Sequence, residues 1–157
     1  MKTPMTEIDR IADQLERGFD GDAWHGDPLL KILEGVTAKQ AAATPIAHAH
    51  NIWEIVNHIR AWRSAIEARL NGQVRELAGT ADWPPITDTS ETAWRDCIRD
   101  LCQRHQSFID AVRAFPESKL YENAPNRDHS NYVMLHGMVQ HDPYHAGQIA
   151  MLKKAAR

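Results

Sequence analysis

The chain has 157 residues, of which 43% are apolar and 25% charged, the balance of a globular protein and not of a disordered one. Its formal net charge of -3 gives no electrostatic reason to expect a nucleic-acid partner. No run approaches the roughly eighteen apolar residues of a membrane helix, and the N-terminal sequence lacks the apolar core of a signal peptide. We therefore predict a single domain, residues 1–157, that is cytoplasmic and has no membrane partner.

An amphipathic helix is predicted over residues 6–19. Its apolar side chains recur at steps of three and four: Ile8, Ile11, Leu15 and Phe19. The connection that follows, residues 24–44, is expected to contain two short helices. One would begin at an Asp27 N-cap with Pro28 in the first helical position, and the other at a capping box that starts with Thr37.

A second long helix is predicted from residue 46 or 51 to residue 70. Its apolar face is formed by Ile52, Ile55, Ile59, Trp62, Ile66 and Leu70. His58 shares this face, because it lies three residues after Ile55 and four before Trp62. Residues 72–89 break every periodicity and are predicted to form a loop, in which Trp83 either caps a pocket or anchors the loop to the helices.

A third helix is predicted over residues 90–115, and His105 on its apolar stripe is interpreted as a hydrogen-bonded core residue. The last helix is predicted from residue 129 or 130 to 154. Its inward line consists of Met134, Met138, His141, His145, Ile149 and Leu152. Four long helices without β alternation predict an all-α four-helix bundle. Its two long connections make an up-down-down-up order as feasible as simple up-and-down.

His141 and His145 lie one helical turn apart on the same side of the last helix, a spacing that lets both imidazoles reach one metal ion. No glutamate follows His141, which excludes the H-E-x-x-H metalloprotease site. His58 is the third inward-facing histidine. Three neutral imidazoles are the protein ligands of a catalytic zinc site with one open position. A buried histidine network without metal is the alternative.

Other polar residues near this set have weaker claims. Glu54, one turn before His58, is a candidate general base or outer-shell acceptor, although an exposed surface carboxylate is the plainer interpretation. Asp142 points roughly 100° away from His141 on an ideal helix and is not expected to be a ligand. Pro143 is expected to kink the helix. The predicted pocket-lining residues are Trp62, Tyr144 and Gln148.

Two segments resemble the DinB/YfiT-like family of metalloenzymes: WEIVNHI at residues 53–59 and HDPYHAGQI at residues 141–149. The resemblance implies an up-down-down-up four-helix bundle, often a homodimer, with a zinc or nickel ion held by His58, His141 and His145. Relatives in this family include S-transferases that use bacillithiol or mycothiol, and a mycothiol-dependent maleylpyruvate isomerase.

The leading hypothesis is therefore a metal-dependent enzyme that transfers a low-molecular-weight thiol to a small-molecule substrate. A metal-dependent hydrolase with Glu54 as its base is the second hypothesis. The third is a non-catalytic interaction module whose metal ion stabilises the packing of two helices.

Overall fold

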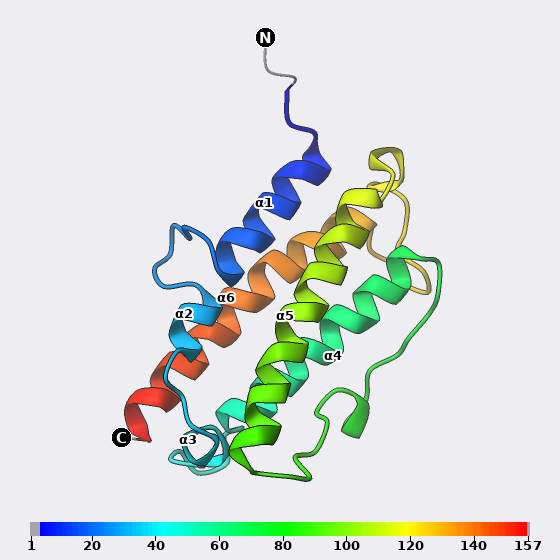
Figure 1. Cartoon of the computed structure of the whole chain (residues 1–157). Helices are drawn as coiled ribbons and strands as arrows, with labels where there is room; N and C mark the ends of the chain where they lie inside the picture. The colour runs from blue at the N-terminus through cyan, green and yellow to red at the C-terminus, as the bar shows by residue number, and fades with distance from the viewer. Residues whose placement is uncertain (1–3, 157) are drawn as a thin grey trace.

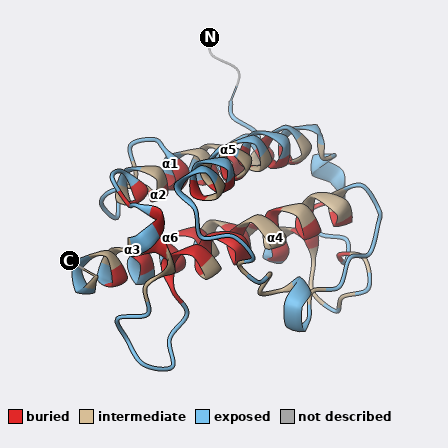
Figure 2. Ribbon diagram, turned by 60° about the horizontal axis from the view of Figure 1, so that its bottom comes forward, coloured by how far each residue is buried: buried red, intermediate tan, exposed pale blue. Residues whose placement is uncertain are grey.

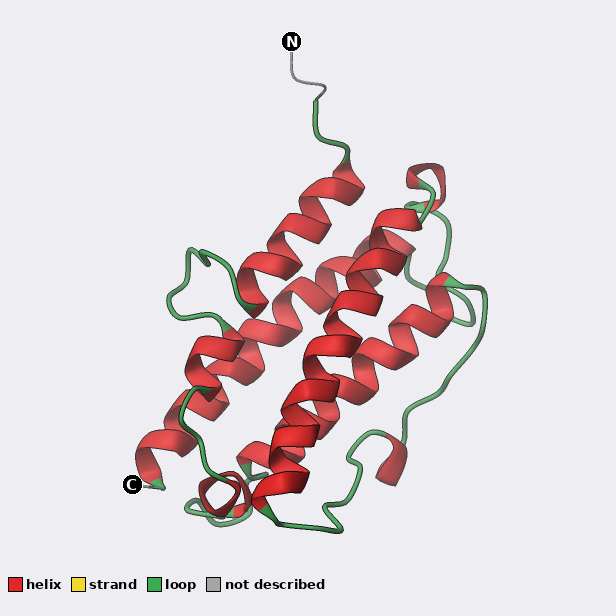
Figure 3. Ribbon diagram, in the orientation of Figure 1, coloured by secondary structure: helices red, strands yellow, loops and turns green. Residues whose placement is uncertain are grey.

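Four long helices lie side by side in the computed structural model, which describes residues 4–156 (Figure 1). The long helices are α1 (Glu7–Phe19), α4 (Ile52–Leu70), α5 (Glu91–Ala114) and α6 (Asn131–Ala155). The connections contain α2 (Leu29–Leu33), α3 (Ala38–Ala42) and two 3₁₀ turns, Gly79–Ala81 and Glu117–Lys119. Residues 4–156 form no strand, only one isolated bridge between Asn123 and Ser130 (Figure 3). The predicted all-α helical bundle is confirmed.

Each long helix begins at a residue whose side-chain oxygen accepts a backbone N–H of the first turn, which satisfies a donor that the helix itself leaves free. These N-caps are Thr6, Asn51, Ser90 and Ser130. The predicted capping box at Thr37 is confirmed. The prediction for α2 was wrong by one residue: Pro28, not Asp27, occupies the N-cap, and no side chain caps that helix.

The long helices do not simply alternate in direction. In Figure 1, α4 and α5 run the same way along the bundle, whereas α1 and α6 run the opposite way. Parallel neighbours cannot be joined by a tight turn, so the chain returns along the whole bundle through the irregular segment between α4 and α5. This segment passes close to the middle of α4, where Asn57 donates to the Pro84 carbonyl at 3.2 Å.

The buried residues lie on the helix faces that are turned toward one another (Figure 2). They form two apolar clusters, one around α2, α3 and the C-terminal half of α6, the other around α1 and the N-terminal half of α6. None of the helices within residues 4–156 is both long and apolar enough to cross a membrane.

A polar layer is formed by three buried side chains, Arg63 of α4, His105 of α5 and Asp142 of α6, next to the ring of Phe19 at the end of α1. The Arg63 guanidinium donates to the Asp142 carboxylate at 2.6 Å, and its Cζ lies 4.6 Å from the centre of the Phe19 ring. His105 stacks on the Phe19 ring, with 3.8 Å between the ring centres. His105 is buried, but the predicted hydrogen bonding was wrong: neither ring nitrogen has a partner within residues 4–156.

His105 is expected to make the protein sensitive to mild acid. Burial lowers the pKa of His105 to about 3, so below pH 6.5 the unfolded chain binds a proton that the folded chain does not. Between pH 6.5 and 5 the free energy of unfolding should fall by about 1–2 kcal/mol from this group alone. His105→Leu should remove that part of the pH dependence in urea unfolding at the two pH values. An unchanged pH dependence in the variant would contradict the assignment.

Candidate metal centre

The structure brings His58 of α4 together with His141 and His145 of α6. One ligand nitrogen from each ring lies within 4.8 Å of the other two, and this is the one such group of three found among residues 4–156. The Nε2 atoms of His58 and His141 are 3.2 Å apart. Two imidazole nitrogens bound tetrahedrally to zinc would be separated by about 3.3 Å. The α6 helix continues through Pro143 without a break, so both of its histidines stay one turn apart on one face.

The hydrogen-bond partners of His58 and His145 determine which nitrogen of each ring carries the proton. His58 Nδ1 is 2.9 Å from the Asp82 carboxylate and 3.1 Å from the Asp82 carbonyl oxygen, both of which can only accept. His145 Nδ1 is 2.6 Å from the amide oxygen of Gln148. Both Nδ1 atoms therefore carry hydrogen, and both Nε2 atoms keep a free lone pair for a metal ion.

The electrostatics around His141 favour the same tautomer. If His141 Nε2 donated a hydrogen bond to His58, its unprotonated Nδ1 would lie buried, without a donor, 3.9 Å from the Asp142 carboxylate. A lone pair directed at an anion is unfavourable. A proton on Nδ1 instead faces Asp142, and Nε2 then presents a third lone pair to the same point. Three lone pairs that converge in a buried site repel one another unless a cation lies between them, so the residues fit a metal ion.

The environment also keeps the rings in their ligand form. Burial lowers the pKa of His58, and burial together with the neighbouring His141 lowers the pKa of His145 to about 4. Burial acts to raise the pKa of Asp142, but the charge of Arg63 and the contact with His141 outweigh it and bring it to about 2. At neutral pH the centre thus combines neutral imidazoles at His58 and His145 with an ionised carboxylate at Asp142.

A cavity of about 890 Å³ opens directly beside the three histidines. Its lining includes the three residues predicted from sequence, Trp62, Tyr144 and Gln148. Trp83 also lines the cavity, and it is anchored there by stacking against His58, with 4.0 Å between the ring centres. The loop tryptophan is thus anchored to α4 and also forms part of the cavity wall.

Glu54 is placed elsewhere. Its carboxylate accepts the backbone N–H of Asn51 at 3.0 Å, which completes the capping box of α4, and lies 3.1 Å from His50 Nδ1. It is not among the residues that line the cavity. The candidate general-base role of Glu54 therefore has no geometric support, and its carboxylate instead stabilises the start of the helix that carries His58.

Two residues of the site were missed in the sequence. Asp82 accepts the indole N–H of Trp62 at 2.9 Å while it contacts His58, so one carboxylate orients a metal ligand and a cavity wall. His50 stacks on Trp83, with ring centres 3.5 Å apart. Both belong to irregular segments, and no periodicity could have indicated their positions.

Comparison with known proteins gives one family. The family model described as the DinB superfamily matches residues 23–149. No curated protein and no solved structure gave a match.

Proposed function

The chain belongs to the DinB superfamily, whose model covers most of its length, and on that premise we propose that it is a metal-dependent thiol S-transferase. The ion, zinc or nickel, would be held by His58, His141 and His145. The observation that carries the proposal is that one ring nitrogen of each of the three histidines lies within 4.8 Å of the other two, at the wall of a large cavity. Three neutral ligands leave a coordination position for an exogenous group.

The residues of the chain would divide the work of such a reaction. A divalent ion bound there would supply the charge that favours a thiolate over a thiol. Asp82 and Gln148 hold His58 and His145 in the tautomer that ligation requires, and the Asp142 carboxylate, 3.9 Å from His141 Nδ1, favours the same tautomer of His141. The cavity walls would hold the electrophile against the sulfur and limit the access of water.

Hydrolysis is less well supported, because a water nucleophile needs a base beside it. Glu54 is engaged at the start of α4, and the one carboxylate that lines the cavity, Asp82, is engaged by His58 and Trp62. A purely structural metal site is also less well supported, since such sites are closed by a fourth protein ligand.

We further propose that the protein is cytoplasmic and forms a homodimer. Sedimentation analysis would test the homodimer.

Calorimetric titration of the zinc-loaded protein with small thiols tests the transferase proposal. We expect at least one thiol to bind, and the binding to disappear when zinc is first removed with a chelator. The corresponding alcohol, which has oxygen in place of sulfur, should bind far more weakly because zinc prefers thiolate. If no thiol binds the zinc-loaded protein, the transferase proposal is wrong even though the metal site stands.

A further inference from the structure

The cavity beside the metal centre has walls without a permanent positive charge. No lysine or arginine is among its lining residues, all of which belong to the described part of the chain. Two basic residues are direct chain neighbours of lining residues, and both are engaged elsewhere. Arg63 is buried in its pair with Asp142, and Lys153 donates to the carbonyl oxygens of Ile32 and Glu34 at 2.8 and 2.6 Å.

The remaining charges of the site balance one another. Asp82 is the one carboxylate in the cavity wall, and it is occupied by His58 and Trp62. A divalent ion on neutral imidazoles would carry two positive charges, which Asp82 and one thiolate would offset. Nothing would then compensate a second negative charge on either co-substrate, and moving an uncompensated anion out of water into this cavity is costly.

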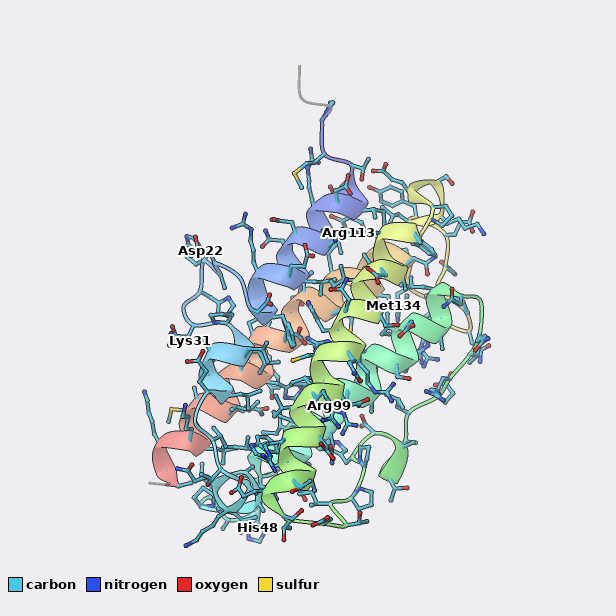
Figure 4. The ribbon with its side chains drawn as sticks, in the orientation of Figure 1. Asp22, Lys31, His48, Arg99, Arg113 and Met134 are labelled. Atoms are coloured by element: carbon cyan, nitrogen blue, oxygen red, sulfur yellow. The ribbon has the colours of Figure 1, made fainter. Side chains whose placement is uncertain are left out.

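The lining of the cavity is mostly apolar. Three of the exposed large apolar side chains of the protein line it: Ile46, Tyr144 and Met151. Tyr144 and Met151 are seven residues apart and therefore lie on one face of α6. Between them Gly147 contributes no side chain, and a Cβ built on it meets nothing within 4 Å. A groove thus leads between an aromatic and a thioether side chain toward the histidines. His48, at the lower end of the molecule in Figure 4, also lines the cavity.

From these features we infer that the site selects co-substrates whose organic body is uncharged and apolar, of the size of a substituted aromatic ring, and discriminates against anionic ones. The inference rests on the proposed function for the identity of the site, but it concerns selection by the cavity wall. A cavity of about 890 Å³ is large enough for such a body together with a small thiol. Thiols that carry several carboxylates are expected to bind poorly.

Two probes that share the 4-tert-butylphenyl body test this selection: 4-tert-butylbenzyl alcohol and 4-tert-butylbenzenesulfonate. Calorimetric or NMR titrations at pH 8 use the protein as purified, together with the variants Gly147→Leu and Gln140→Leu. We expect the alcohol to bind about tenfold more tightly than the sulfonate, or better. Gly147→Leu fills the groove and should weaken the binding of the alcohol by about tenfold. Gln140→Leu adds the same side chain to an exposed position of the same helix that is not part of the cavity lining, and should leave the binding of both probes unchanged.

A sulfonate that binds as tightly as the alcohol would overturn the inference, as would an alcohol that binds Gly147→Leu as tightly as the wild type. A bound metal ion would attract the sulfonate, so the comparison is biased against the expected result. Neither probe is a thiol. Failure here and failure of the thiol titration are therefore separate outcomes.

Discussion

Replacing Arg63 by methionine is expected to lower the free energy of unfolding by about 3–5 kcal/mol, which corresponds to a fall in Tm on the order of 10 °C. The side chains of Arg63 and Asp142 are 1% and 3% exposed and lie 2.6 Å apart. Methionine would match much of the volume of arginine but would leave the Asp142 carboxylate buried without its counter-charge. The loss of stability reflects the cost of that unpaired buried charge more than the strength of the ion pair. Urea unfolding at pH 7 followed by circular dichroism is the measurement.

Two further variants separate this effect from the general consequences of losing an arginine. Arg63→Met combined with Asp142→Leu removes both charges and should recover most of the lost stability. Arg99→Met removes an exposed arginine of α5 (Figure 4) that pairs with Asp96, and should cost less than about 1 kcal/mol. If Arg63→Met were no more destabilising than Arg99→Met, the buried ion pair would not be a major element of the fold.

The polar layer also adjoins the metal centre through Asp142. In the doubly substituted protein the stability returns but the carboxylate that faces His141 Nδ1 is absent. Metal affinity should therefore stay roughly 10–100-fold below that of the wild type. Stability and metal binding would thus be separated in one variant.

His145→Ala is expected to abolish metal binding at physiological zinc concentrations while the bundle stays folded. The substitution removes one of three ligands, so the loss of affinity should exceed the roughly 10–100-fold that follows from the loss of an outer-shell partner. His145 borders the cavity, so its truncation enlarges a space that is already open and leaves no closed void in the core. Competition with a chromophoric zinc chelator gives the affinity, and far-UV circular dichroism gives the helix content.

His136→Ala is the matched control on the same helix. His136 is half-buried, lies 3.6 Å from the Glu7 carboxylate, and takes no part in the metal centre. The control should bind zinc like the wild type. Unfolding of His145→Ala under conditions where His136→Ala stays folded would favour a structural metal site over a functional one.

The helices could be predicted from the sequence because their signals are local. Thr6, Asn51, Ser90 and Ser130 are good N-caps, and apolar side chains follow each of them at helical spacing. The same periodicity placed His58, His141 and His145 on inward faces, and the structure brings these three rings together. Periodicity can therefore indicate which residues share one face of a helix.

The parts that could not be predicted depend on contacts between distant segments. Asp82 reaches His58 only because the irregular connection after α4 folds back along that helix. The pairing of Arg63 with Asp142 joins residues of α4 and α6. Helical spacing places Arg63 on the apolar face, four residues after Ile59 and three before Ile66, but it cannot show which residue of another helix Arg63 contacts. Helix geometry directed Asp142 away from His141, but it could not show that Asp142 contacts Arg63.

The most direct test of the metal centre is the long-range ¹H–¹⁵N spectrum of the histidine side chains, recorded before and after one equivalent of zinc is added. We predict that His58, His141 and His145 all shift to the pattern of an imidazole ligated through Nε2 and protonated at Nδ1, while the other six of the nine histidines do not. Zinc that leaves these three rings unchanged, or ligates them through Nδ1, would contradict a site built on their converging Nε2 atoms.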